Sequence, residues 1–95
     1  MAGYTAQVKL TWKRELNDEN YYYHNLYLQI GKYKTWVAEV SQWWATADTY
    51  NVWLCLDNSG VATHEPKEFK TVDDAKAYTE KRVIKYFGLK ENTDV

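Results

Sequence analysis

The stretch from Tyr21 to Gln42 decides the fold of this chain, and it reads YYYHNLYLQIGKYKTWVAEVSQ. Its first half alternates apolar and other side chains in steps of two, which is typical of a half-buried β-strand. Gly31-Lys32 interrupts the alternation, and glycine accepts the positive φ angle that a two-residue hairpin turn requires. We therefore predict two antiparallel strands, over residues 21–30 and 33–42, joined by a tight turn.

The alternation also predicts which side chains of this hairpin face the core. In the first strand the core-facing set is Tyr22, His24, Leu26, Leu28 and Ile30, and the opposite set is Tyr21, Tyr23, Asn25, Tyr27 and Gln29. In the second strand the core-facing set is Trp36, Ala38 and Val40, and the opposite set is Tyr33, Thr35, Val37 and Glu39. One face of the sheet is thus expected to be largely aliphatic and the other rich in tyrosine.

Further strands are predicted on both sides of the hairpin. Residues 4–13 alternate cleanly, and their apolar face consists of Tyr4, Ala6, Val8, Leu10 and Trp12. The polar run 17–20 predicts a turn. Residues 49–56 predict a fourth strand, and residues 57–60 predict another turn. A short fifth strand is expected over residues 61–64, ended by Pro66 because proline has no N–H to donate.

The last element is a helix that begins after Thr71. Thr71 is a good N-cap residue, and Asp73 and Asp74 suit the first turn, where negative charge is favourable. Gly88 fits the left-handed position that ends a helix, and Leu89 is expected to fold back on Ile84. The buried stripe at helical spacing is predicted to be Val72, Ala75, Thr79, Val83, Tyr86 and Phe87.

Together these elements predict an α+β fold. We expect an antiparallel sheet of four or five strands in meander order, with one C-terminal helix packed on one face. The sheet and helix form a single domain over residues 1–89, and residues 90–95 are expected to be a flexible tail.

The composition excludes several classes of protein. The net charge is −1 and neither half of the chain is strongly basic, which argues against general binding of duplex nucleic acid. Cys55 is the only cysteine, so an intramolecular disulfide or a thiolate metal cluster is not expected. The sequence has neither a signal-peptide pattern nor an apolar run long enough to span a membrane. We expect a cytoplasmic protein.

No catalytic or metal-binding pattern stands out among the residues that carry chemistry. His24 and His64 are the only histidines, and neither has a carboxylate or Cys55 at a metal-ligand spacing. Cys55 falls in a predicted central strand, where a buried, unreactive thiol is the usual outcome. The four glycines stand far apart, so no phosphate-binding loop is expected. We expect neither an enzyme nor a cofactor or metal site.

The aromatic content is the main indication of function, because nine tyrosines and five tryptophans exceed what so small a core holds. One interpretation is cross-strand aromatic pairing on a solvated sheet face. Another is that this face contacts a protein partner or a second copy of the chain, since interface cores are enriched in Tyr and Trp. The residues that we expect to make this contact are Tyr21, Tyr23, Tyr27, Tyr33, Trp43, Trp44 and Trp53.

A third interpretation is that bases of single-stranded nucleic acid stack on the same aromatic side chains. This function also requires a basic groove that follows the phosphate backbone. The basic residues predicted to border the sheet are Lys9, Lys13, Arg14, Lys32 and Lys34. Acidic residues offset them, so a protein partner remains the first hypothesis.

The segment from Phe69 to Glu80, FKTVDDAKAYTE, resembles the helix that closes the sheet in many small phage and prophage proteins of unassigned function. The resemblance implies an accessory protein of a phage or mobile element. Such a protein acts in the host cytoplasm and binds and inhibits or modulates a host protein, for example a component of a defence system. The order of four strands and a helix is also similar to single-stranded-DNA-binding transcriptional coactivators, without a shared sequence motif. Neither resemblance carries over a functional residue.

Overall fold

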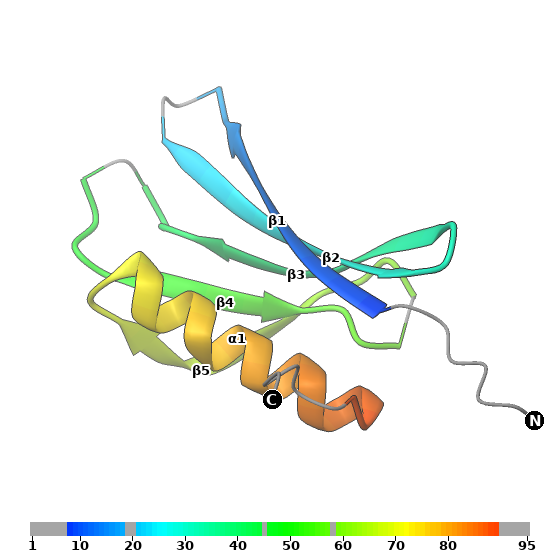
Figure 1. The fold of residues 1–95 in the computed structure, drawn as a ribbon. Coiled ribbons are helices and arrows are strands. Elements are labelled where there is room, and N and C mark those ends of the chain that lie inside the picture. Colours follow the sequence, from blue (N-terminus) through cyan, green and yellow to red (C-terminus); the bar gives the residue numbers. More distant parts are fainter. Residues whose placement is uncertain (1–7, 19–20, 45, 58, 90–95) are drawn as a thin grey trace, which may run out of the picture.

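A computed structural model describes residues 8–18, 21–44, 46–57 and 59–89 (Figure 1). Its elements are β1 (Val8–Leu16), β2 (Tyr22–Ile30), β3 (Tyr33–Ser41), β4 (Tyr50–Leu54), β5 (Thr63–Phe69) and α1 (Val72–Phe87). The five strands form one sheet in the order of the chain, and all neighbours are antiparallel. Helix α1 packs across β3, β4 and β5 on one face of this sheet. The predicted α+β meander with a C-terminal helix is confirmed.

The central hairpin and the helix form where the sequence predicts them. Ile30 pairs with Tyr33 across the turn, where Gly31 has a φ of 61°. Thr71 caps α1, since its hydroxyl oxygen accepts a hydrogen bond of 3.1 Å from the backbone N–H of Asp74. Gly88 ends the helix at a φ of 66°. The part of the first predicted strand before Val8, and the predicted tail 90–95, lie outside the described residues.

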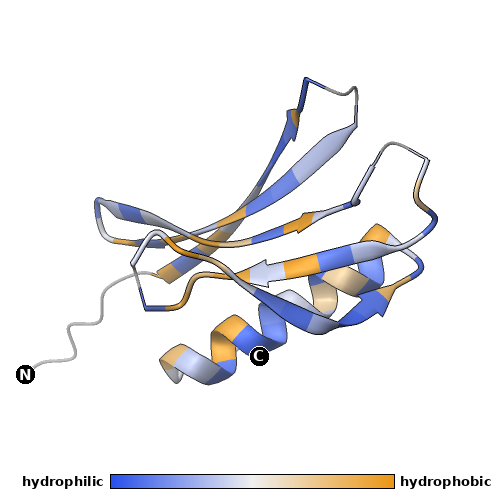
Figure 2. Ribbon diagram, turned by 180° about the vertical axis from the view of Figure 1, so that it is seen from behind, coloured by the Kyte–Doolittle hydropathy of each residue, from blue (hydrophilic) through white to orange (hydrophobic). Residues whose placement is uncertain are grey.

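The core lies between α1 and the sheet. Its buried residues are Leu26, Leu28, Val37, Ala38, Val40, Val52, Leu54, Phe69, Ala75 and Val83. Figure 2 shows hydrophobic and hydrophilic positions alternating along the strands, which is the pattern of a sheet with one face on the core. The thiol of Cys55 is buried, as predicted. None of the described helical residues belongs to a helix long and apolar enough to cross a membrane.

The predicted helical stripe is wrong at its C-terminal end. Ala75, Thr79 and Val83 are buried, but Tyr86 and Phe87 are exposed. The last turn is closed by the backbone N–H of Leu89, which bonds to the carbonyl of Ile84 at 3.0 Å. Leu89 packs on the core, while the rings of Tyr86 and Phe87 pack edge-on against each other at 5.0 Å.

A β-bulge at Val37 overturns the predicted faces in the first half of β3. Leu26 pairs with Ala38 but Tyr27 pairs with Trp36, so Val37 is an extra residue in β3. Val37 is buried, and its carbonyl accepts a hydrogen bond of 2.8 Å from the backbone N–H of Cys55. Because alternation shifts by one residue at the bulge, Trp36 lies with Tyr27 rather than in the core.

The same shift moves Thr35 and Tyr33 to the helix side of the sheet. They pair with Leu28 and Ile30, which alternate with Tyr27. Tyr33 was expected beside Tyr21, Tyr23 and Tyr27, and that placement is wrong. A strand pattern extrapolated across a bulge assigns every residue beyond it to the opposite face.

The predicted end of the fifth strand is also wrong, because Pro66 lies inside β5 (Thr63–Phe69) rather than after it. This strand is at an edge of the sheet, where a residue without an N–H is tolerated. Its pairing with β4 is irregular between the two pairs Asn51–Glu68 and Trp53–His64. The longer β5 provides Glu65 and Phe69 as contacts for Tyr78 of α1.

Candidate functional site

The candidate site lies on the side of the sheet that is turned away from α1, which we call the open face. The indole Nε1 of Trp12 donates a hydrogen bond of 2.6 Å to Glu80 of α1, so Trp12 and its cross-strand partner Leu26 face the helix. Residues that alternate with them face away. One row of the open face takes a residue from each strand in turn, and it consists of Lys13, Asn25, Glu39, Trp53 and His64.

Three rings pack together where this row reaches β4 and β5. The rings of Trp53 and His64 are 4.6 Å apart, and the ring of Trp43, from the segment after β3, lies 5.8 Å from Trp53 and 5.3 Å from His64. The two indoles meet edge to face at 84°, a favourable geometry for aromatic pairs. Trp43 nevertheless keeps 46% of its surface exposed. The cluster is therefore packed from within and accessible from outside.

Two tyrosines extend this cluster towards β2. The ring of Tyr21 packs edge-on against Tyr23 at 6.3 Å, and its hydroxyl donates a hydrogen bond of 3.2 Å to the carbonyl of Trp43. This bond ties the segment that carries Trp43 to the start of β2. We call Tyr21, Tyr23, Trp43, Trp53 and His64 the aromatic patch.

Asn51 lies beneath the aromatic patch and is 1% exposed. Its Oδ1 is 2.9 Å from Nε2 of His64, so a proton on Nε2 completes a hydrogen bond between them. Among the described residues, its Nδ2 has no partner. A buried amide without a partner costs roughly 1 to 3 kcal/mol. Asn51 therefore holds the ring of His64 in place at some cost to stability.

A chain of hydrogen bonds occupies the middle of the open face. Nε1 of Trp36 donates to Oδ1 of Asn25 at 3.0 Å, and Nδ2 of Asn25 donates to Glu15 at 3.2 Å. The other oxygen of Glu15 lies 3.5 Å from the ammonium of Lys13. Trp36 was predicted in the core, and only the bulge at Val37 brings it here; the period-two pattern alone contains no signal for it.

The structure brings together four of the seven residues predicted to contact a partner. Tyr21, Tyr23, Trp43 and Trp53 belong to the aromatic patch, whereas Tyr27 lies further along the open face, where Lys34 covers its ring at 5.0 Å. The other two predicted residues are exposed elsewhere: Tyr33 is 77% exposed on the helix side, and Trp44 follows Trp43. His64, for which the sequence predicts no functional role, belongs to the cluster.

The five predicted nucleic-acid-binding residues are spread over different surfaces. Lys9, Lys13 and Lys34 lie on the open face, since they pair with or beside Gln29 and Asn25. Arg14 lies on the helix side, where its guanidinium stacks on Tyr22 at 4.3 Å, and Lys32 is in the hairpin turn. These cations do not follow one continuous line across the sheet.

Two titratable groups on the helix side have pKa values shifted by burial and by contacts within the fold. Partial burial, and then the positive charges of Lys76 and Arg14, lower the pKa of His24. The hydrogen bond of 2.7 Å that Tyr78 donates to Glu65, and then burial, raise the pKa of Tyr78. Within the described ranges, no three His, Cys, Asp or Glu side chains are grouped so that they could hold a metal ion.

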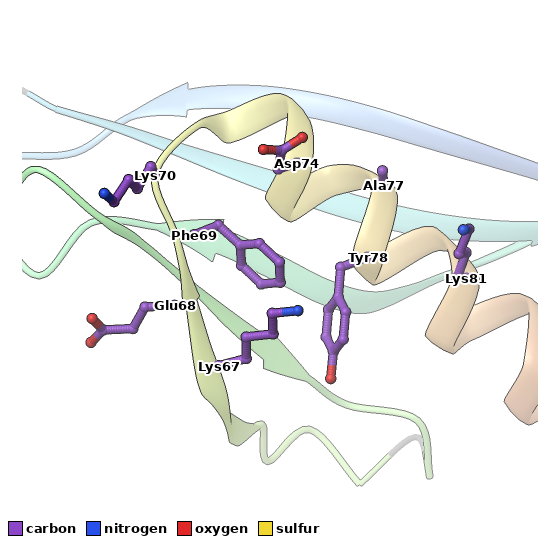
Figure 3. A pocket seen from close by; sticks show the side chains of 8 residues that line it. All are labelled: Lys67, Glu68, Phe69, Lys70, Asp74, Ala77, Tyr78 and Lys81. Atoms are coloured by element: carbon purple, nitrogen blue, oxygen red, sulfur yellow. The ribbon is translucent and has the colours of Figure 1, made fainter.

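A hollow on the helix side lies between β5 and α1 (Figure 3). It is lined by Lys67, Glu68, Phe69, Lys70, Asp74, Ala77, Tyr78 and Lys81. The ammonium of Lys67 lies 5.3 Å from the centre of the Phe69 ring and 5.9 Å from that of Tyr78. In Figure 3 the side chains of Glu68 and Lys70 point away from the helix, while Lys67, Phe69 and Tyr78 gather in the hollow. Its contacts are those of a helix docked on an edge strand.

Comparisons with known proteins give no information about the function of this chain. No family model matches the sequence, and no curated protein or solved structure matches the chain. The relationship to phage accessory proteins stays a prediction.

Proposed function

We propose that this protein is a non-enzymatic interaction module that binds a protein partner through the aromatic patch. The observation that carries the proposal is the packing of Trp43 on Trp53 and His64, which leaves Trp43 half-exposed on the face that α1 does not cover. Protein interfaces obtain most of their affinity from a few Trp, Tyr and Arg side chains.

The internal contacts of the patch favour binding over simple cross-strand pairing. The edge-to-face indole pair and the bond from Tyr21 to the carbonyl of Trp43 hold the patch in one arrangement before a partner arrives. Fewer side chains then lose freedom on binding, which raises affinity. Lys13 and Glu15, which end the chain of hydrogen bonds through Asn25, are charged groups with solvent-accessible side chains on the same face, as at the polar rim of an interface.

The biological role that we propose is that of a phage or mobile-element accessory protein in the host cytoplasm. It inhibits or modulates a host protein by covering a surface of that protein, for example on a defence system. The resemblance of residues 69–80 to the closing helix of such proteins supports this role. A small domain acts in this way by occupying a site, so it needs no chemistry of its own.

Trp43→Ala is the sharpest test, because it removes a half-exposed ring without emptying the core. The tagged protein is used to capture partners from a bacterial lysate, and the captured protein is then titrated by calorimetry. Loss of a central interface tryptophan costs 2 kcal/mol or more, so we expect Kd to rise about 30-fold. Tyr86→Ala, at an exposed ring on α1, is the control and should leave Kd unchanged. Equal Kd values for Trp43→Ala and the wild type would contradict the proposal.

Binding of single-stranded nucleic acid is the second candidate function. One end of the open face supports it, because Lys34 covers the ring of Tyr27 there and pairs with Gln29, which in turn pairs with Lys9. Titration of an oligothymidylate at low salt should then quench tryptophan fluorescence, and affinity should fall steeply as salt is added. Unchanged fluorescence at low salt would remove this candidate.

A further inference from the structure

We propose that two copies of this protein pair through β1, which joins their sheets into one sheet of ten strands. This inference concerns an edge of the sheet and does not rest on the function proposed for the aromatic patch. It follows from three observations: the regularity of β1, its position in the sheet and the order of charges along it.

Strand β1 is the regular edge of the sheet. It makes nine successive pairs with β2 without a bulge, and no described strand lies on its other side. An edge strand presents outward N–H and C=O groups that suit pairing with another strand. The opposite edge, β5, contains Pro66 and pairs irregularly with β4. Proline and irregular pairing protect an edge from such addition, and β1 has neither.

The sequence of β1, VKLTWKREL, complements itself when two copies run antiparallel about Trp12. The cross-strand pairs are then Val8–Leu16, Lys9–Glu15, Leu10–Arg14 and Thr11–Lys13, each formed twice, with Trp12–Trp12 on the two-fold axis. Lys9 of each copy lies opposite Glu15 of the other. Directly opposed unlike charges stabilise antiparallel strands, and like charges destabilise them. The axis then lies between the two strands, perpendicular to the sheet, and two-fold symmetry is the commonest symmetry of homodimers.

The neighbouring registers that preserve the faces are disfavoured. A shift of the axis to Thr11 places Lys9 opposite Lys13 of the second copy, and a shift to Lys13 places the two Lys13 side chains opposite each other. Registers centred between residues would instead place the open face of one copy beside the helix side of the other. Of these registers, the charges therefore favour the one centred on Trp12.

The same register covers the two most exposed aliphatic residues of the strand. Val8 is 41% exposed and Leu16 is 57% exposed, and both alternate with the open face, on the side of Trp12. Pairing places each Val8 against Leu16 of the second copy. Glu15 also contacts Lys13 and Asn25, but a carboxylate has about four acceptor positions, so Lys9 of the second copy can join them.

A charge exchange between positions 9 and 15 tests the dimer. Mass in solution is measured by sedimentation and light scattering over a concentration series. We expect the wild type to dimerise, and Lys9→Glu and Glu15→Lys each to weaken dimerisation about tenfold or more, because each places two like-charged pairs across the axis. The double variant, Lys9→Glu with Glu15→Lys, should regain the wild-type dimer. Lys81→Glu, at an exposed position on α1, makes the same change in net charge as Lys9→Glu and should have no effect.

Mixing provides an independent readout. Equimolar Lys9→Glu and Glu15→Lys proteins should form heterodimers, since both pairs between positions 9 and 15 then join a glutamate to a lysine. Circular dichroism melting shows that each variant is folded. A monomeric wild type, or a mixture that stays monomeric, would overturn the proposal. A dimer unaffected by both Lys9→Glu and Glu15→Lys would place the contact elsewhere, for example on the aromatic patch, and would also overturn the proposal.

Discussion

The two faces of the sheet are built on different principles. The face under α1 is filled by aliphatic residues such as Leu26, Val40 and Val52, which are completely buried. The open face is held by hydrogen bonds and ring contacts, such as the bond from Trp36 to Asn25 and the packing of Trp53 on His64. Aliphatic burial supplies stability without regard to direction, whereas the open face has directional contacts that fix the positions of its groups. We therefore expect the helix side to determine stability and the open face to determine recognition.

The largest expected effect compares two adjacent residues of β2 that point in opposite directions. Leu26→Ala leaves a cavity in the core and should lower the free energy of unfolding by about 3 kcal/mol. Tyr27→Ala removes a larger side chain from the open face and should cost less, about 1 kcal/mol. Urea unfolding of both variants measures the difference. Equal losses would mean that the two faces share the stability of the fold.

The next effect concerns the hydrogen bonds of the open face. Asn25→Ala removes the acceptor of the Trp36 indole and the donor to Glu15 at a buried position, and should cost about 2 kcal/mol. Trp36→Phe removes only one of these bonds and should cost less. If unfolding in urea shows additive losses in the double variant, the two residues do not act as one network.

A smaller effect tests whether α1, which covers only one face of the sheet, influences binding on the other face. Thr71→Ala removes the N-cap of α1 and should lower stability by about 1 kcal/mol. Thr71→Ser keeps the hydroxyl and should restore most of the loss. Because the patch is on the other face, the affinity for a partner should stay the same in both variants. A change in affinity that parallels the change in stability would show that the faces are coupled.

The smallest effect is a pH dependence that belongs to the helix side. Burial, together with Lys76 and Arg14, lowers the pKa of His24 below its ordinary value of 6.5. The unfolded chain then binds the proton more readily than the folded protein does, so stability should fall as pH drops through that value. In His24→Asn, the melting temperature should change less between about pH 7.5 and 5.5 than it does in the wild type. An equally steep profile in the variant would assign the dependence to another group.

Local sequence signals predicted the parts of the fold that depend on neighbours in the chain. The hairpin turn at Gly31 and the caps at Thr71 and Gly88 are such signals, because each depends on a few adjacent residues. Pro66 illustrates the limit: its effect depends on whether β5 is at an edge, which only the complete sheet determines.

The candidate site was predictable only in part, for the same reason. Alternation in β2 correctly placed Tyr23 and Tyr27 away from the core, because no bulge interrupts β2 where it pairs with β1. Alternation in β3 misplaced Trp36 and Tyr33, because a bulge interrupts it at Val37. The carbonyl of Val37 bonds to the backbone N–H of Cys55, which is distant in the sequence. The contact of His64 with Trp43 and Trp53 joins three separate segments, and no spacing along the chain encodes it.

The bulge at Val37 has a consequence for how β3 is constructed. Counted from the hairpin turn, the side chains alternate without a fault as far as Trp36; counted back from Ser41, they alternate without a fault as far as Ala38. The turn sets the phase of one half of the strand and the core sets the phase of the other, and the two phases differ by one residue. Val37 is the extra residue that joins the two halves. We therefore expect that a change in hairpin length shifts the pairing of the residues before Val37 and leaves the pairing of those after it in place.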